Sequence, residues 1–73
     1  MSEQNVLSDI AGSVWKIEVK VGDRVSADDT LIVLESMKME IPVVAPCAGT
    51  ILSLQVGEGD SIAEGQILGV IQR

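Results

Sequence analysis

The feature of this chain that most constrains its fold is an internal repeat with a shift of 37 residues. Residues 11–36 align with residues 48–73, with seven identical positions, and the pair Gly22-Asp23 falls on Gly59-Asp60. A Gly-Asp pair is typical of a turn, because Gly accepts a positive φ and Asp hydrogen-bonds to nearby backbone. We therefore expect two copies of one strand–turn–strand unit, packed face to face with approximate twofold symmetry. Residues 37–47 have no counterpart in this alignment and connect the two copies.

The apolar residues recur with a period of two. Residues 15–21 and 52–56 alternate between apolar and polar side chains, which predicts half-buried strands with Trp15 and Leu52 facing the core. The continuous apolar runs 31–34 and 67–71 predict strands covered on both faces. No window has a convincing helical stripe. The pattern predicts one all-β domain over residues 1–73, a small barrel or sandwich.

The composition excludes most enzyme mechanisms. The chain has 73 residues, no His and a single Cys. It therefore lacks the usual general base near neutral pH and the commonest metal ligand, and it has no room for a deep catalytic cavity. A lone Cys cannot form an internal disulfide or a Cys-rich zinc site. We predict no catalytic residues and no metal site.

The charge balance restricts the partners. Eleven acidic and five basic residues give a formal net charge of −6, which repels nucleic acid and anionic membranes. No stretch is long and apolar enough for a membrane span, and the first residues do not resemble a secretion signal. We therefore expect a cytoplasmic protein that binds neither nucleic acid nor membrane.

The connecting segment contains the most distinctive candidate site. Strand pattern ends near Glu35 and resumes at Glu40, so a hairpin turn is expected near 36–39 with Lys38 at its tip. Met37 and Met39 flank that lysine, and exposed methionines are adaptable contact residues. A lysine on a turn is suited to acylation. The same residues also fit a plain solvated lysine and two gap-filling methionines, so the pattern alone leaves both interpretations open.

The sequence around Lys38 resembles the attachment motif of biotin carboxyl carrier domains. The run Glu35-Ser36-Met37-Lys38-Met39-Glu40 contains the Met-Lys-Met core of that motif. The resemblance extends over nearly the whole chain and is strongest to small free-standing biotin/lipoyl attachment proteins of bacteria. Further matching segments are Gly12-Ser13-Val14, Val21-Gly22-Asp23-Arg24-Val25, Ala45-Pro46-Cys47-Ala48-Gly49, Glu58-Gly59-Asp60 and Ile67-Leu68.

The resemblance implies both a fold and a function. The fold is a flattened eight-strand β-barrel or sandwich of two four-stranded sheets, with internal pseudo-twofold symmetry and Lys38 on an exposed hairpin. Biotin protein ligase would attach biotin to the Lys38 Nζ through an amide. Biotin carboxylase would load a carboxyl group on the biotin and a carboxyltransferase would unload it, with Met37 and Met39 contacting these partners. The chain would thus be a non-catalytic carrier.

The sequence departs from the family pattern in three places. Ser36 stands where Ala is usual, and Asp28 stands where the second repeat has Gly65, so a turn with Asp in the left-handed region is expected there. The protruding thumb of some carrier domains has no room between Val19 and Val25. Two alternatives remain: a lipoyl carrier modified at Lys38, and a binding module that is never modified. Lipoyl domains usually have Asp-Lys-Ala where this chain has Met-Lys-Met.

Overall fold

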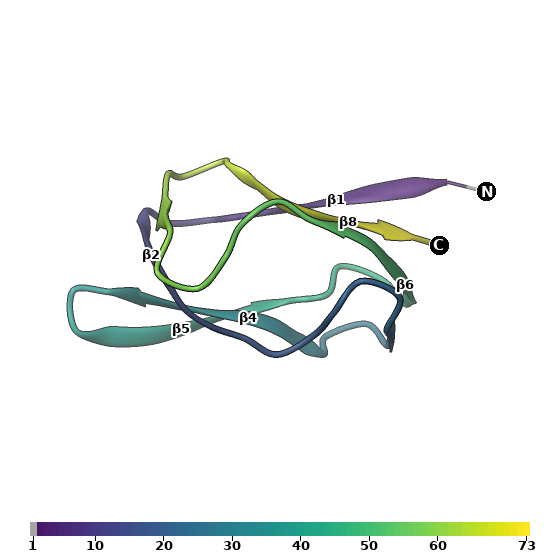
Figure 1. Ribbon diagram of the computed structural model, residues 1–73, viewed down its shortest axis with the longest axis horizontal. Helices are drawn as coiled ribbons and strands as arrows, with labels where there is room; N and C mark the ends of the chain where they lie inside the picture. The colour runs from purple at the N-terminus through teal and green to yellow at the C-terminus, as the bar shows by residue number, and fades with distance from the viewer. Residues whose placement is uncertain (1) are drawn as a thin grey trace.

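The computed structural model describes residues 2–73, which form eight strands in two antiparallel four-stranded sheets (Figure 1). The strand order is β1-β8-β6-β3 in one sheet and β5-β4-β2-β7 in the other. The expected all-β sandwich of two four-stranded sheets is confirmed. The strands are β1 (Glu3–Leu7), β2 (Gly12–Ile17), β3 (Arg24–Val25), β4 (Thr30–Ser36), β5 (Met39–Val44), β6 (Gly49–Leu54), β7 (Ser61–Ile62) and β8 (Ile67–Gln72).

The two halves of the chain repeat the same hydrogen bonds at a shift of 37 residues. The Gly22 N–H donates to the Ile51 carbonyl at 2.8 Å, and the Gly59 N–H donates to the Val14 carbonyl at 2.8 Å. Each bond crosses from one half to the other, so neither half completes its backbone pairing alone. The pseudo-twofold relation predicted from the repeat is confirmed.

The repeat is longer than the sequence alignment suggested. The strand β5 corresponds to β1, because Glu40 pairs with Glu35 just as Glu3 pairs with Gln72. The prediction that residues 37–47 lack a counterpart was therefore wrong. Only the tight turn between β4 and β5 connects the halves, and its equivalent position is the end of the sandwich where both chain termini lie (Figure 1).

The turns of the two halves use the same chemistry. Gly22 and Gly59 have φ values of 96° and 91°, which Gly adopts without steric cost. The carboxylates of Asp23 and Asp60 each accept a backbone N–H three residues earlier, from Lys20 at 2.9 Å and from Gly57 at 2.8 Å. These Asx contacts fix the turns that the repeated Gly-Asp pair predicted.

The expected non-Gly turn at Asp28 is also confirmed. Asp28 has a φ of 72°, and its equivalent Gly65 has a φ of 82°. The same left-handed position is therefore occupied by Asp in one half and by Gly in the other. Asp is one of the few residues other than Gly that adopt this region readily, and the neighbouring Asp29 carboxylate accepts the Ser26 N–H at 2.9 Å.

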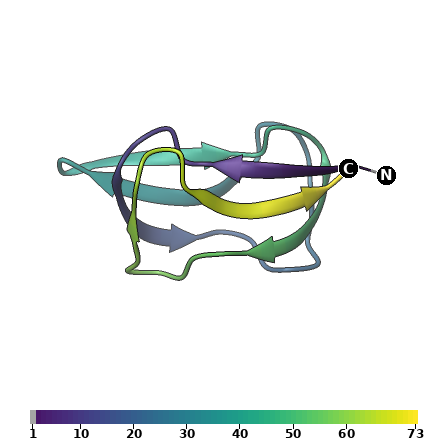
Figure 2. The same cartoon turned by 90° about the horizontal axis from the view of Figure 1, so that it is seen from above.

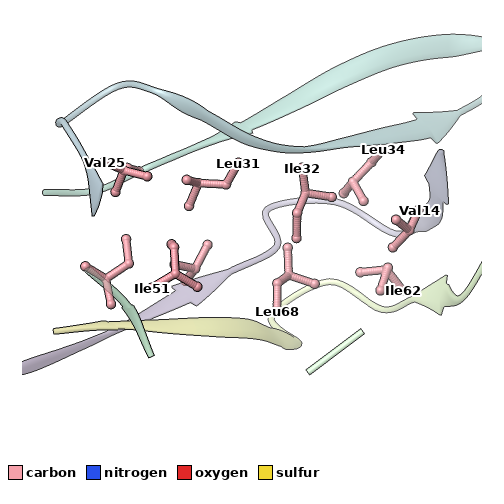
Figure 3. Packing of buried hydrophobic residues seen from close by; sticks show 11 residues of the cluster. Val14, Val25, Leu31, Ile32, Leu34, Ile51, Ile62 and Leu68 are labelled. Carbon is pink, nitrogen blue, oxygen red and sulfur yellow. The ribbon is translucent and has the colours of Figure 1, made fainter. Parts of the chain in front are cut away.

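The core lies between the sheets and consists of aliphatic side chains from both halves (Figure 3). Many members are equivalent pairs, such as Val14 with Ile51 and Leu31 with Leu68. The core thus has the symmetry of the fold. Its buried residues are Val6, Val14, Val25, Leu31, Ile32, Leu34, Ala45, Ile51, Ile62, Leu68 and Ile71.

Two bulges overturn the predicted placement of Trp15 and Leu52. The pairing register shifts between Val14 and Lys16 in β2, and between Ile51 and Ser53 in β6. A bulge inserts an unpaired residue, so the alternation changes phase. Trp15 is consequently 52% exposed and Leu52 37% exposed, while the residue before each is buried.

The end of the first alternating run was also misplaced. The strand β2 ends at Ile17, and Val21 lies outside the strands with its side chain exposed. Ile17 and Val19 pack against the core as predicted. Residues 15–21 therefore extend beyond the end of β2, although Ile17 and Val19 still pack against the core.

The β4–β5 hairpin projects from the elongated body, whose extents are 37 × 18 × 18 Å (Figure 2). The strand β4 is central in its sheet, whereas β5 is an edge strand that contains Pro42. Pro suits an edge, since it has no N–H to donate to a neighbouring strand. Within residues 2–73, the structure contains no helix with the length and apolar character needed to cross a membrane.

Candidate functional site

The tip of the hairpin is a two-residue turn formed by Met37 and Lys38. Ser36 and Met39 are the last paired residues, and the two residues between them have φ values of 52° and 66°. Two positive φ values in a two-residue loop define a type I′ turn, which matches the twist of the flanking strands. Asn and Gly are the usual residues at these positions. This turn therefore places two ordinary side chains in a conformation that disfavours them.

The side chains at the tip project into solvent. Met37 is 90% exposed and Met39 62% exposed, and Lys38 is also exposed. Large apolar side chains gain stability from burial, so this arrangement contributes little to the free energy of folding. The combination of disfavoured backbone and unburied methionines indicates a segment shaped for contact with other molecules.

The charges near the turn are mostly acidic. Glu35 and Glu40 lie directly opposite each other at the base of the turn, and both are exposed. Like charges at opposed positions destabilise a strand pair slightly. Within residues 2–73, the single ion pair joins the Lys16 Nζ and the Glu18 Oε1 at 3.5 Å. The Lys38 ammonium group therefore takes part in no ion pair there.

The base of the hairpin is paired with the neighbouring strand β2. Ser13 pairs with Glu35, and Gly12 pairs with Ile62 of β7. A Cβ atom on Gly12 would lie 2.6 Å from the Glu35 carbonyl oxygen, closer than real Cβ atoms approach. Gly12 thus allows the close approach of backbone that anchors the strand leading to Lys38.

The arrangement suits covalent modification more than catalysis. A primary amine on a flexible four-carbon stem can act as a nucleophile toward an activated carboxyl group. Because its surroundings are open, an acyl group can be joined to the Lys38 Nζ without moving the strands. Among the described residues, no three His, Cys, Asp or Glu side chains form a cluster that could hold a metal ion.

The structure places the sequence-predicted residues where the motif suggested. The turn lies between Ser36 and Met39, with Lys38 in the turn and Met37 and Met39 beside it. Their proposed roles remain predictions. Sequence reasoning missed the opposed Glu35 and Glu40, although their symmetric spacing about the turn was a usable signal.

Comparison with known proteins places the chain in a family. Residues 6–71 match the family model described as "Biotin-requiring enzyme". The biotin/lipoyl attachment protein of Bacillus subtilis is 44% identical over 59 residues, which cover 81% of each chain. The biotinylated protein TB7.3 homolog of Mycobacterium leprae is 43% identical over 68 residues, covering 93% of this chain and 96% of that protein.

A solved structure agrees with these relatives. The urea carboxylase of Kluyveromyces lactis superposes with a TM-score of 0.92 at 32% identity, covering 99% of this chain. The matched region is 6% of that much longer enzyme. The similarity therefore concerns one domain of the carboxylase.

Proposed function

We propose that Lys38 is the biotin attachment site of this chain, which belongs to the biotin/lipoyl attachment family and is a biotin carrier. The observation that supports this assignment is the position of Lys38 in the type I′ turn, exposed and flanked by two exposed methionines. The other lysines, Lys16 and Lys20, lie far from this turn in sequence and outside the motif.

The chemistry at Lys38 is acylation. The uncharged Nζ attacks the activated carboxyl group of biotin, and the amide forms as the activating group leaves with its electron pair and the Nζ gives up a proton. A biotin protein ligase supplies the activated, ATP-derived acyl group and, since the chain has no His, also the base that takes the proton. When bound, biotin accepts and donates a carboxyl group through its ureido ring. The residues of this chain present the cofactor and do not take part in bond breaking.

The partners of a loaded carrier are carboxylase enzymes, as the similarity to urea carboxylase supports. We infer that a biotin carboxylase and a carboxyltransferase each receive the hairpin in turn. Tethering raises the effective concentration of biotin at both active sites. Met37 and Met39 provide adaptable apolar contacts to these enzymes, and the net charge of −6 steers the chain toward basic surfaces.

The composition and charge of the chain support inferences about its location in the cell and about the molecules it does not bind. We infer that residues 1–73 act as one carrier domain in the cytoplasm, where the ligase and the carboxylase partners would meet it. The acidic surface supports the further inference that it binds neither nucleic acid nor membrane.

The test is the intact mass of the protein after co-expression with a biotin protein ligase. Wild type and Lys16→Arg are expected to gain one biotinyl group, and Lys38→Arg none. A parallel co-expression with a lipoate ligase distinguishes the alternative carrier, which the name of the Bacillus subtilis relative keeps open. If wild type stays unmodified with both ligases, the carrier assignment fails.

A further inference from the structure

A groove lined mainly by aliphatic side chains lies beside the hairpin, between the end of β1 and the strand β5. It encloses about 120 Å³. Pockets for drug-sized molecules are larger, roughly 300–1,000 Å³, so this groove suits a single small ring system. Asp9 provides the one charged side chain among the lining residues. The lining residues are Leu7, Asp9, Ile10, Leu34, Ile41, Pro42, Val43 and Val44.

The groove breaks the pseudo-twofold symmetry of the fold. At the shift of 37 residues, Ile41, Pro42 and Ile10 correspond to Gln4, Asn5 and Cys47, and Asp9 corresponds to Pro46. The equivalent surface therefore has amide side chains where the groove has Ile41 and Pro42, and it has no carboxylate. Symmetric packing does not require this difference, because β1 and β5 have the same pairing in their sheets. Aliphatic walls combined with a single carboxylate are therefore found on the side of Lys38.

The groove is connected to the turn by apolar side chains. Side chains alternate along a strand, so Met39, Ile41 and Val43 lie on one face of β5. Met39 is 62% exposed, and Ile41 and Val43 line the groove. An apolar track thus leads from the residue next to Lys38 into the groove.

The dimensions of a biotinylated Lys38 fit this track. Ile41 is three residues from Lys38, which corresponds to roughly 10 Å along an extended strand. About eleven bonds separate the Lys38 Cα from the bicyclic ring of an attached biotin, a reach of roughly 14 Å when extended. The ring can therefore enter the groove while the acyl chain lies over Met39.

We propose that the groove is a resting site for the biotinyl group of Lys38, with the acyl chain along Met39 and Ile41 and the ring between Leu7 and Ile10. The Asp9 carboxylate accepts a hydrogen bond from a ureido N–H, which sets the orientation of the ring. The docked biotinyl group is shielded from solvent while the carrier is not bound to a partner enzyme. This inference rests on the proposed attachment of biotin at Lys38.

The test compares amide signals of the biotinylated and unmodified protein by two-dimensional NMR, after intact mass has shown the adduct. We expect shifts at Leu7, Ile10 and Val43 as well as around the turn, and slower amide exchange at those positions. Ile41→Gln introduces the residue found at the equivalent position 4, and it should abolish the groove shifts while keeping the adduct. The matched control Leu52→Gln alters a partly exposed apolar residue of β6 outside the groove and should keep them.

The outcomes separate this inference from the proposed function. Adduct with shifts confined to residues 36–40 overturns the resting site and leaves attachment intact, whereas a sample without adduct overturns both. If the unmodified protein shows groove shifts that grow with concentration, a second copy occupies the groove and the inference fails. Should Ile41→Gln unfold, Leu7→Gln at the half-exposed opposite wall serves in its place.

Discussion

Replacing Met37 with Gly should stabilise the unmodified protein, although it removes a large apolar side chain. Met37 has a φ of 52°, in the left-handed region, which costs an ordinary residue roughly 1–2 kcal/mol. Gly removes that cost, but it enlarges the conformational entropy of the unfolded chain by an equivalent of about 0.4–1 kcal/mol. The side chain is 90% exposed, so its loss sacrifices almost no buried area. The net expectation is a gain of about 0.5–1 kcal/mol.

The assay is urea and thermal unfolding of unmodified wild type and Met37→Gly. A gain of that size raises Tm by roughly 2–8 °C in a domain of this length, with an unchanged urea m-value. Asp28→Gly is the matched control, since Asp28 also has a positive φ but its conformation suits Asp. Its change should be smaller. A loss of stability in Met37→Gly would refute the reasoning, because it would show that the Met37 side chain packs into the fold.

Three further predictions concern the support of the site and the bulges. Gly12→Ala should cost about 2 kcal/mol or more in unfolding free energy, because its Cβ would meet the Glu35 carbonyl at 2.6 Å; Gly57→Ala, whose nearest neighbour is 3.9 Å away, should change it by less than about 0.5 kcal/mol. Equal costs for the two variants would show that the contact at Gly12 does not determine stability. Trp15→Ala should lower the free energy of urea unfolding by only about 1–2 kcal/mol, because half of the side chain is already exposed. A buried Trp would cost ~3–5 kcal/mol, and a loss in that range would show that Trp15 is packed in the core. Met37→Leu combined with Met39→Leu should leave Tm nearly unchanged and alter the rate of carboxylation by a biotin carboxylase. A large fall in Tm would instead place both methionines in the core.

The turns were predictable from the sequence because their residues have backbone roles. Gly22 and Gly59 stand where φ is positive, and the following Asp residues accept the backbone N–H that closes each turn. Asp28 was likewise recognisable as a left-handed position by comparison with Gly65. Such signals are local, so they survive without knowledge of the tertiary structure.

The bulges were not predictable, because an extra residue in a strand is defined only by its partner. Trp15 continues a regular alternation in the sequence, yet the register shift in β2 turns it outward. The partner β4 lies a dozen or more residues away, and nothing within the alternating run marks the shift. The same holds for Leu52 in β6.

The full extent of the repeat and the groove were missed for different reasons. The equivalence of β1 and β5 rests on two identities, Glu3 with Glu40 and Val6 with Val43, which were too few to notice beside the stronger match downstream. The groove is built from the edges of two different sheets, so its residues become neighbours only in the folded chain. The turn that holds Lys38 was predictable, since strand pattern stops and resumes on either side of it.

We propose that attachment requires the lysine at the second position of the turn, and not merely a lysine somewhere in the turn. The most direct test exchanges two neighbours, Met37→Lys together with Lys38→Met, which keeps the composition and charge. After co-expression with a biotin protein ligase, intact mass should show one biotinyl group on wild type and none, or a small fraction, on the exchanged variant, with both proteins folded. Full biotinylation of the exchanged variant would contradict the account.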